Sequence, residues 1–329
     1  MADAAAARAV ELLLGGRVTG VETPGDRSAE SLRVRLEDRS VIATRRDNSQ
    51  RGAMEAVALQ ALAARGAPVP RMLAFDGSWM IQEDVGEQRL SEALFHASRR
   101  DGERWLEAAV MSLRAVHDAG RAARLERLLP TLGGGDKWLD ELVDIPHRLA
   151  RRLDVPAPAL PVADLTELLK VSRPRFIKWD ARPGNAAALA DGSVIWFDWE
   201  HCGCRNGLDD LAWLLGDEYT PDWPDAELEL IERHLAAFDD GEDRAQAEDY
   251  LAAFGTLHMC VRLSLIVSRK GDGDWWDWQR CLSGDRVGVT REATLRVCRR
   301  AARWAERSPS TAILSPWFES LASVIEGWQ

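Results

Sequence analysis

The chain has 329 residues, of which 46% are hydrophobic and 29% are charged, and its formal net charge is −11. These values are typical of a globular protein and exclude a disordered or fibrous chain. The length allows one large domain or two modest ones. No apolar run reaches the roughly 18 residues that a membrane span needs. An acidic balance is also unsuited to binding a nucleic-acid backbone.

The beginning of the chain and the cysteines bear on where the protein works. Residues 1–16 carry Arg8 and Glu11 inside an apolar stretch and lack a basic front, so they predict a helix and not a secretion signal. The five cysteines are odd in number and lack paired spacing, which predicts no disulfide framework and a reducing cytoplasm. A metal site at His201-Cys202-x-Cys204 lacks a second pair of ligands.

Alternating apolar and polar residues predict that residues 1–86 form a strand-rich lobe. Its clearest signal is a hairpin in which Leu32, Val34 and Leu36 alternate with charged residues before a turn at residues 38–40. The strands are expected at 18–21, 32–37, 41–45, 72–75 and 79–82. A helix at 50–65 interrupts them, and residues 83–87 are typical of a hinge.

Residues 87–329 are predicted to form a larger, mainly helical lobe, which makes the fold class α+β. Apolar periodicity places its helices near 103–119, 136–152, 161–171, 208–216, 224–238, 244–268, 289–306 and 315–328. Short strands at 175–179, 186–190 and 194–198 stand out from this pattern, with a tight turn at Asp191-Gly192.

The segment 175–200 carries the most informative polar residues. Asp180 and Asn185 lie in a loop that leaves one strand, and Asp198 ends a strand that returns through a hairpin. The three side chains are therefore expected to converge. Two carboxylates and an amide oxygen suit Mg²⁺, and a carboxylate left free could orient a hydroxyl group and accept its proton. Metal ligands and a free carboxylate are the groups that phosphoryl transfer requires.

The pattern D-x-x-x-x-N, followed by an apolar strand ending in D-W-E, resembles the catalytic core of the aminoglycoside phosphotransferase family. That family is the small-molecule branch of the protein-kinase-like fold. Asp209-Asp210-Leu211-Ala212 resembles the start of the family's next helix, and Met54–Arg65 running into Gly66-x-Pro68-Val69-Pro70 resembles its N-lobe helix and following strand. The resemblance covers roughly residues 15–216 and is specific at 180–215.

The resemblance implies a bilobal kinase-like fold with nucleotide bound in the cleft between residues 15–86 and the helical lobe. Asp180 would be the catalytic aspartate, and Asn185 and Asp198 would hold the Mg²⁺ ions that bridge the phosphates of ATP or GTP. Arg182 could neutralise the transferring phosphoryl group. Glu200 shares a strand face with Asp198 and could line the site.

The family also places a cation in the small lobe, held by a glutamate from the lobe's helix. No lysine precedes Lys137, so Arg45 is the first candidate and Arg46 the second, with Glu55 as the partner. The alternative to this phosphate-binding role is that Arg45 and Glu55 form an ordinary surface ion pair. The phosphate-covering loop is poor in glycine, and its candidate contacts are Gly25 and Ser28.

The sequence leaves the role of several features open. Lys178-Trp179 stands where the family has His-Gly, and the lysine could lower the pKa of Asp180 or pack away from it. Asp210 is most simply a helix N-cap. The tryptophans 275, 276 and 278 pack C-terminal helices or form an aromatic wall of an acceptor pocket. The acidic stretch 200–250 is a solvated face or the rim of a site for a cationic acceptor.

The sequence therefore predicts a kinase-like enzyme that transfers a γ-phosphoryl group to a hydroxyl of a small molecule. Two alternatives have different functions: a pseudokinase that binds nucleotide without turnover, and a helical scaffold that binds none. The chain contains no G-x-S-x-G, H-E-x-x-H, Walker A or G-x-G-x-x-G motif, so hydrolase, zinc peptidase, P-loop ATPase and dinucleotide-binding functions lack support.

Overall fold

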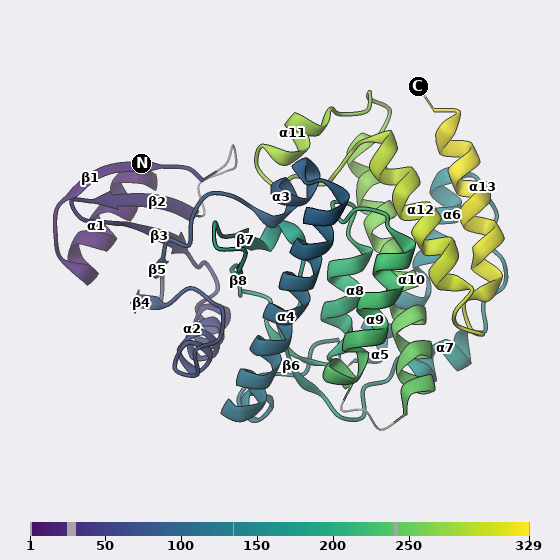
Figure 1. The fold of residues 1–329 in the computed structure, drawn as a ribbon, viewed down its shortest axis with the longest axis horizontal. Helices are drawn as coiled ribbons and strands as arrows, with labels where there is room; N and C mark the ends of the chain where they lie inside the picture. The colour runs from purple at the N-terminus through teal and green to yellow at the C-terminus, as the bar shows by residue number, and fades with distance from the viewer. Residues whose placement is uncertain (1, 25–30, 134, 240–242, 329) are drawn as a thin grey trace.

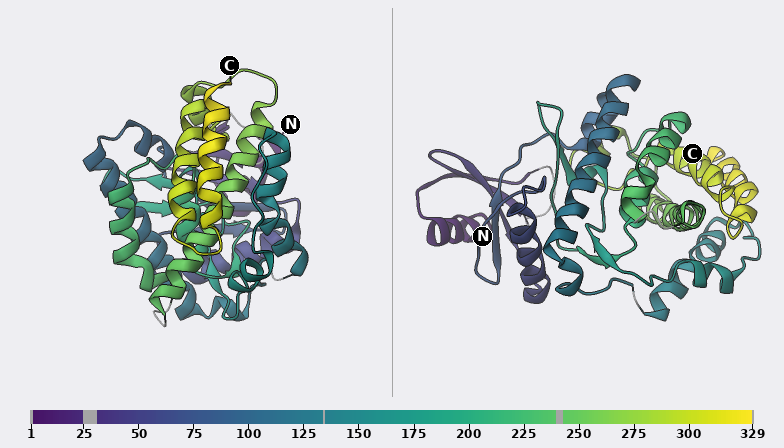
Figure 2. Two further views of the ribbon diagram at one scale, coloured as in Figure 1. Left: turned by 90° about the vertical axis from the view of Figure 1, so that its right-hand side faces the viewer. Right: turned by 60° about the horizontal axis from the view of Figure 1, so that its bottom comes forward.

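A computed structural model describes residues 2–24, 31–133, 135–239 and 243–328. It contains a small region built on one antiparallel sheet and a larger region made mostly of helices (Figure 1). The two lie side by side along the long axis of the molecule, and the right-hand view of Figure 2 shows the same division from another direction. This is the α+β arrangement predicted from the sequence.

The sheet of the small region has five strands in the order β1-β2-β3-β5-β4. Their bounds are Val18–Glu22 (β1), Ser31–Leu36 (β2), Ser40–Arg45 (β3), Met72–Phe75 (β4) and Trp79–Glu83 (β5). The predicted hairpin is confirmed, since β2 and β3 pair with Val34 opposite Val41. Leu32, Val34 and Leu36 pack beneath helix α1 (Ala2–Leu14), so the other face of the sheet is left for polar residues.

Helix α2 (Ser49–Ala63) links β3 to β4. It begins at Asn48, whose side chain accepts hydrogen bonds from the backbone N–H groups of Gln50 and Arg51. Glu55 and Leu59 both lie on its buried side. A carboxylate is thus carried into the interior by a helix whose other buried residues are apolar.

The large region contains helices throughout and two short strand pairs. Its helices are α3 (Leu90–His96), α4 (Arg99–Ala123), α5 (Asp136–Val143), α6 (Ile145–Leu153), α7 (Val162–Leu168), α8 (Leu208–Gly216), α9 (Pro224–Asp239), α10 (Arg244–Lys270), α11 (Trp278–Leu282), α12 (Arg291–Ala305) and α13 (Ser315–Glu326). Its strands are β6 (Arg175–Ile177), β7 (Ala186–Ala188), β8 (Val194–Trp196) and β9 (Gly203–Arg205). β6 pairs with β9, and β7 with β8.

Three details of the prediction are wrong. The single helix expected at 136–152 is two helices, because the chain turns at Asp144 and Pro146 begins α6. The strand expected at 175–179 ends at Ile177, since Trp179 has φ +52°. The short elements α3, α11 and β9 were not predicted; each has too few residues for a clear apolar period.

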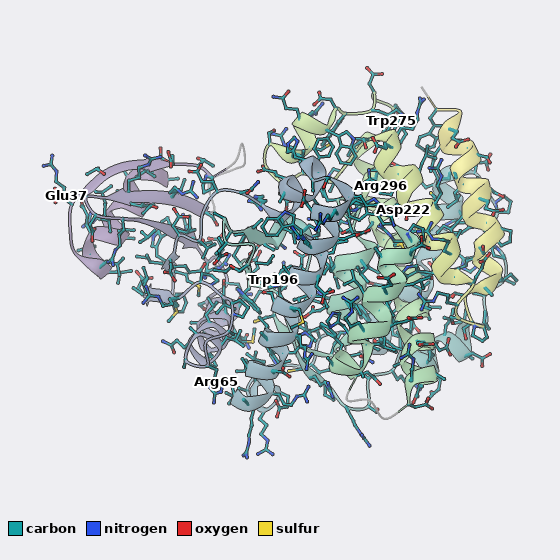
Figure 3. The ribbon with its side chains drawn as sticks, viewed as in Figure 1. Glu37, Arg65, Trp196, Asp222, Trp275 and Arg296 are labelled. Carbon is teal, nitrogen blue, oxygen red and sulfur yellow. The ribbon has the colours of Figure 1, made fainter. Side chains whose placement is uncertain are left out.

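Helix α10 is the central helix of the large region and packs against α8 and α12. By length and composition it could span a bilayer, but 78% of its most apolar window is buried inside the protein. Burial accounts for its hydropathy without a membrane. The hairpin β7–β8 lies where the two regions meet, and its buried Trp196 is labelled at that junction in Figure 3.

Candidate active site

The loop between β6 and β7 contains Asp180 in an unusual backbone conformation. Trp179 and Asp180 have φ of +52° and +60°, in the left-handed region that bulky residues rarely occupy. Asp210 of α8 fixes this conformation, because its carboxylate accepts the N–H groups of Lys178 at 2.7 Å and Trp179 at 2.8 Å. His117 lies 2.8 Å from the same carboxylate. The N-cap interpretation of Asp210 is therefore wrong; this buried side chain positions the loop.

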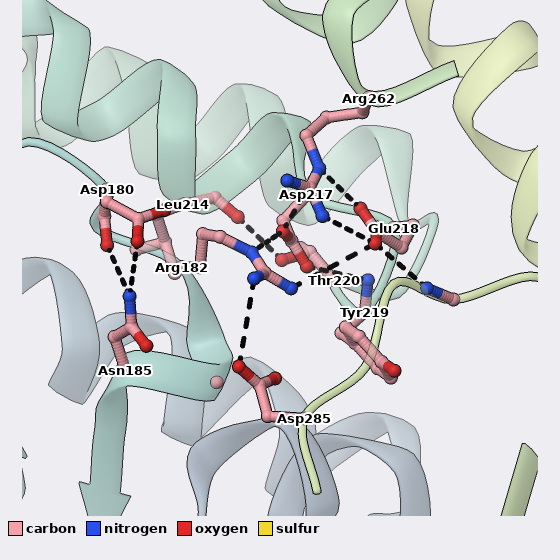
Figure 4. Close-up of polar contacts among 12 residues, drawn as sticks. Asp180, Arg182, Asn185, Leu214, Asp217, Glu218, Tyr219, Thr220, Arg262 and Asp285 are labelled. Carbon is pink, nitrogen blue, oxygen red and sulfur yellow. Dashed lines mark hydrogen bonds and ion pairs between the residues drawn. The ribbon is translucent and has the colours of Figure 1, made fainter. Parts of the chain in front are cut away.

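Asp180 and Asn185 meet as predicted. The Asn185 Nδ2 group donates to Asp180 Oδ2 at 2.8 Å and to the Asp180 carbonyl oxygen at 3.0 Å (Figure 4). These two bonds orient the amide, so Asn185 Oδ1 remains for a different partner. The bond to Oδ2 also fixes the Asp180 carboxylate, whose other oxygen, Oδ1, takes no part in the contact with Asn185.

Lys178 connects the two ends of the hairpin. Its Nζ donates to the carbonyl oxygen of Asp198 at 2.9 Å and lies 3.4 Å from that of Asp180. The ammonium is fully buried and stands 5.3 Å from the centre of the Trp199 ring. The lysine thus contacts the backbone of both aspartates and not their carboxylates. Asp198 itself has φ +59° and a side chain that is 40% exposed in the cleft.

The buried carboxylate of Glu55 pairs with Arg46. Arg46 Nε and Nη2 donate to the two Glu55 oxygens at 2.7 and 2.8 Å. The pairing predicted for Arg45 is wrong: its side chain is 66% exposed and lies 3.3 Å from Asp47. Because side chains alternate along β3, Arg45 points away from the face that Arg46 reaches.

The Arg46–Glu55 pair extends to the residues that follow β8. Arg46 Nη2 is 3.9 Å from Asp198 Oδ1, and Nη1 is 3.5 Å from Glu200 Oε2. Burial opposes the charge of Arg46, but the Glu55 carboxylate outweighs burial and raises the arginine pKa. Burial raises the pKa of Glu55 above its usual range, although Arg46 opposes that rise. The small region thus delivers a cation to the aspartate that ends the hairpin.

Arg182 does not reach the place expected from the sequence. Its Nε donates to Asp217 Oδ2 at 2.8 Å, Nη1 is 3.7 Å from Asp285, and Nη2 is 4.0 Å from Glu218 (Figure 4). Burial opposes its charge, but Asp217 and Asp285 outweigh burial and hold the arginine pKa well above its ordinary value. A guanidinium enclosed by three carboxylates is not free to neutralise a phosphoryl group, so that assignment is wrong.

A cleft of about 690 Å³ opens between the sheet and the hairpin. Its lining combines the polar face of the sheet, the hinge at 83–87, and Asn185 and Asp198. Phe197 supplies an apolar floor, with the Arg89 guanidinium 5.2 Å from its ring centre. Gly25 and Ser28 lie outside the described residues, although Thr23 and Pro24 just before them line the cleft.

The sequence model of the phosphotransferase enzyme family matches residues 19–255. The chain belongs to this family. No curated protein sequence is significantly similar to it. Its fold is a bilobal, protein-kinase-like one, shared with solved small-molecule kinases.

Three solved structures illustrate that likeness. An amicoumacin kinase in complex with AMP-PNP, Ca²⁺ and Ami is 16% identical, with a TM-score of 0.56 and 95% of each chain covered. An aminoglycoside phosphotransferase from Alicyclobacillus acidocaldarius is 12% identical, with a TM-score of 0.55 and 96% of each chain covered. A spectinomycin phosphotransferase in complex with ADP and spectinomycin is 11% identical, with a TM-score of 0.55, 80% of this chain covered and 88% of that one.

The oxygen donors of this phosphotransferase fit a magnesium ion. Asn185 Oδ1 and the Asp198 carboxylate line the same cleft. In the described part of the chain no group of three or more His, Cys, Asp or Glu side chains could hold a metal alone. Few protein ligands are what Mg²⁺ requires, because it retains waters and takes substrate phosphates. Cys202 and Cys204 are buried, free thiols of the β9 segment.

The contacts of the tryptophans at 275, 276 and 278 favour a role in packing over a role as an aromatic wall of an acceptor pocket. Trp275 stacks on Trp328 with their ring centres 6.1 Å apart, and Lys270 lies within 5.2 Å of both rings. Trp278 contacts Tyr219 and Phe95. None of the three tryptophans lines the cleft within the described residues.

Proposed function

We propose that this phosphotransferase moves the γ-phosphoryl group of ATP or GTP to a hydroxyl group of a small molecule. The observation that carries the proposal is that Asn185 and Asp198 line one cleft with Arg46, and that Asp180 is hydrogen-bonded to Asn185. Membership of the family and its shared fold with nucleotide-bound kinases support it. Residues 1–86 would act as the nucleotide-binding lobe, and residues 87–329 would supply the catalytic loop and the acceptor site.

Asp180 would act on the acceptor. Its carboxylate, oriented by Asn185, would accept a hydrogen bond from the acceptor hydroxyl and align its oxygen with the γ-phosphorus. The new O–P bond forms as the bond from the γ-phosphorus to the β,γ-bridging oxygen breaks. The bridging oxygen leaves on the diphosphate with the electron pair, and the hydroxyl proton passes to Asp180 and then to water. The products are a phosphomonoester, a nucleoside diphosphate and a proton.

Asn185 and Asp198 would hold Mg²⁺, which supplies charge neutralisation on the phosphates when bound. Arg46 would bind the α- and β-phosphates, and Glu55 holds two of its nitrogens in place for that task. A guanidinium presents a flat fork of donors where the family has a point charge, so it can contact two phosphate oxygens at once.

Nucleotide binding and turnover test this proposal separately. We expect Mg·ATP or Mg·GTP to raise the melting temperature by several degrees at saturation. Asp198→Asn should lose the metal-dependent part of that rise. Asp180→Asn should keep it and lose phosphoryl transfer, including basal transfer to water, by roughly 10²- to 10⁴-fold. The control is Asp164→Asn, an exposed aspartate of α7 outside the cleft.

The two failures have different meanings. Wild-type hydrolysis in Asp180→Asn would refute the catalytic assignment. A nucleotide-dependent rise with no hydrolysis and no transfer in the wild type would favour the pseudokinase alternative. No rise with either nucleotide would refute the nucleotide site itself.

The site of action is proposed to be the cytoplasm. All five cysteines are unpaired and buried. Burial raises the pKa of Cys204 to about 12 and that of Cys281 to about 11, so these thiols are unreactive at neutral pH. Unpaired thiols are typical of a reducing compartment.

A further inference from the structure

A second cavity, of about 180 Å³, lies in the large region on the other side of the catalytic loop. Its walls are aromatic: Trp138 of α5, Trp213 of α8, Phe254 of α10, and Trp179, which directly precedes Asp180. The Trp179 ring centre is 5.8 Å from that of Trp138, 5.6 Å from that of Trp213 and 6.4 Å from that of Phe254. We call this cavity the aromatic pocket.

We propose that the aromatic pocket binds the acceptor, and that the acceptor is a compact, uncharged alcohol with a flat apolar face, such as a hydroxylated carbocycle. The proposal rests on the proposed function, because it names the substrate class for the same reaction. It differs from the cationic acceptor considered from the sequence.

The position of Trp179 links the pocket to the chemistry. Asp180 is linked to both cavities through its neighbours: its hydrogen-bond partner Asn185 lines the nucleotide cleft, and the preceding residue, Trp179, lines the aromatic pocket. Trp179 keeps φ +52°, which a bulky side chain adopts only where its surroundings impose it. An alcohol held against Trp179 would therefore lie beside the residue that directly precedes Asp180.

The charge behind the aromatic walls decides which ligands they accept. The Arg205 guanidinium is buried, with its Cζ 4.3 Å from the ring centre of Trp138, 5.6 Å from Trp179 and 5.7 Å from Phe254. These rings already face one cation. Asp209 binds this guanidinium, so the pair adds no net charge behind the rings. A cationic ligand would have to be buried against the rings without a counter-charge, whereas an uncharged ring would stack without that cost.

The carboxylates that could attract a cationic acceptor are already paired. Asp217 and Glu218 bind Arg182 and Arg262. Asp209 binds Arg205 at 2.6 Å.

The rim of the pocket offers no excess of negative charge. Its one acidic lining residue among those described is Glu141. Lys137 is 3.9 Å from that carboxylate, and Arg148 lines the same rim. The described lining of the pocket therefore carries no net negative charge.

Two polar atoms in the wall lack hydrogen bonds. Trp213 Nε1 and His258 Nε2 are buried and have no partner among the described residues. His258 is uncharged at neutral pH, because burial and the nearby Arg262 lower its pKa to about 3. Because neither nitrogen is open to the cavity, the aromatic pocket offers a ligand the faces of its rings at these two places, which suits the apolar face of an uncharged ring.

A matched pair of probes tests the inference: cis-cyclohexane-1,2-diol and cis-2-aminocyclohexanol, which share a ring and a hydroxyl but differ in charge. Binding is followed by tryptophan fluorescence and by saturation-transfer NMR of the probe. We expect the diol to bind at millimolar concentration, the amino alcohol at least tenfold more weakly, and the diol to accept phosphate from Mg·ATP.

Two variants place the binding. Val261→Phe puts a ring into the pocket from α10, and Trp213→Ala removes one wall. Both should abolish the diol signal while the Mg·ATP melting shift persists. The matched control is Val57→Phe on the exposed side of α2, which should bind the diol as wild type does.

Three outcomes would overturn the inference: equal or tighter binding of the amino alcohol, diol binding that survives both pocket variants, and no diol binding at millimolar concentration. If Mg·ATP still binds and is hydrolysed, only the acceptor inference has failed. If the nucleotide effects are absent too, the proposed function has failed.

Discussion

Two arginines near the candidate site, Arg46 and Arg182, both bind buried carboxylates but differ in what surrounds them. The carboxylates around Arg182 are enclosed: Asp217 and Glu218 are fully buried, and the side chain of Asp285 is 6% exposed. Arg46 has one enclosed partner, Glu55, while Asp198 and Glu200 on its other side are 40% and 33% exposed.

The difference separates a structural cation from one suited to binding a ligand. Every contact of Arg182 is made within the fold, so its charge stabilises the loops that meet there. Arg46 is held by Glu55 but approaches Asp198 and Glu200 only at 3.5 Å or more, without a hydrogen bond. A phosphate in the cleft can replace those distant contacts with close ones.

The largest expected effect lies in the enclosed cluster. Arg182→Ala removes a cation from among three buried carboxylates and should lower the free energy of unfolding by about 3–5 kcal/mol. Chemical denaturation measures this. Arg299→Ala is the control, since that side chain is 62% exposed and 3.7 Å from Glu326; its effect should stay within about 1 kcal/mol. A loss at Arg182 no larger than at Arg299 would contradict the comparison.

The next effect is on nucleotide binding. Arg46→Ala should weaken Mg·ATP binding roughly ten- to a hundredfold, because charge-assisted hydrogen bonds to phosphate contribute about 1.5–3 kcal/mol. Arg46→Lys should restore part of the affinity, since it keeps the charge and loses the fork. Calorimetric titration measures both.

Arg45→Ala is the matched control, because Arg45 is the exposed neighbour of Arg46 on the same chain segment. It should bind nucleotide as wild type does. An equal loss of affinity in Arg45→Ala and Arg46→Ala would return the phosphate-binding role to the residue first chosen from the sequence.

The sequence predicted what depends on short-range pattern. Alternation at Leu32, Val34 and Leu36 gave the hairpin β2–β3, and the spacing of Asp180, Asn185 and Asp198 gave their convergence. The error at Arg45 was avoidable. Val41 and Ala43 pack under α1, so the opposite face carries Ile42, Thr44 and, by continued alternation, Arg46.

Other features depend on contacts far apart in the sequence. The partners of Arg182 are Asp217 and Asp285, which lie on α8's far end and in the loop after α11. No local pattern around Arg182 indicates them. The aromatic pocket likewise combines Trp138, Trp179, Trp213 and Phe254 from four separate segments. The one local signal was Trp179 in place of a glycine, since a left-handed residue suits glycine best.

The smallest expected effect is on the pH dependence of stability, to which two buried glutamates should contribute with opposite signs. Burial raises the pKa of Glu218, but Arg262, Arg182 and the N–H group of Gly288 together outweigh burial and bring it to about 2. Its contribution to stability is present above the ordinary glutamate pKa and is lost as the pH falls toward 2. The pKa of Glu55 is raised instead, chiefly by burial. Its contribution is present below the ordinary pKa and is lost as the pH rises through the folded-state value.

The same substitution in the two clusters should therefore give opposite slopes. The free energy of unfolding of the wild type exceeds that of Glu218→Gln by an amount that should increase by about 1 kcal/mol as the pH rises from 3 to 4.5, because at most one proton is released in that window. The corresponding difference in free energy of unfolding between the wild type and Glu55→Gln should decrease as the pH rises above 4.5. Urea denaturation at a series of pH values measures both differences. Slopes of the same sign would mean that burial and the neighbouring arginines are balanced alike at Glu55 and Glu218, and the contrast between these two glutamates would not hold.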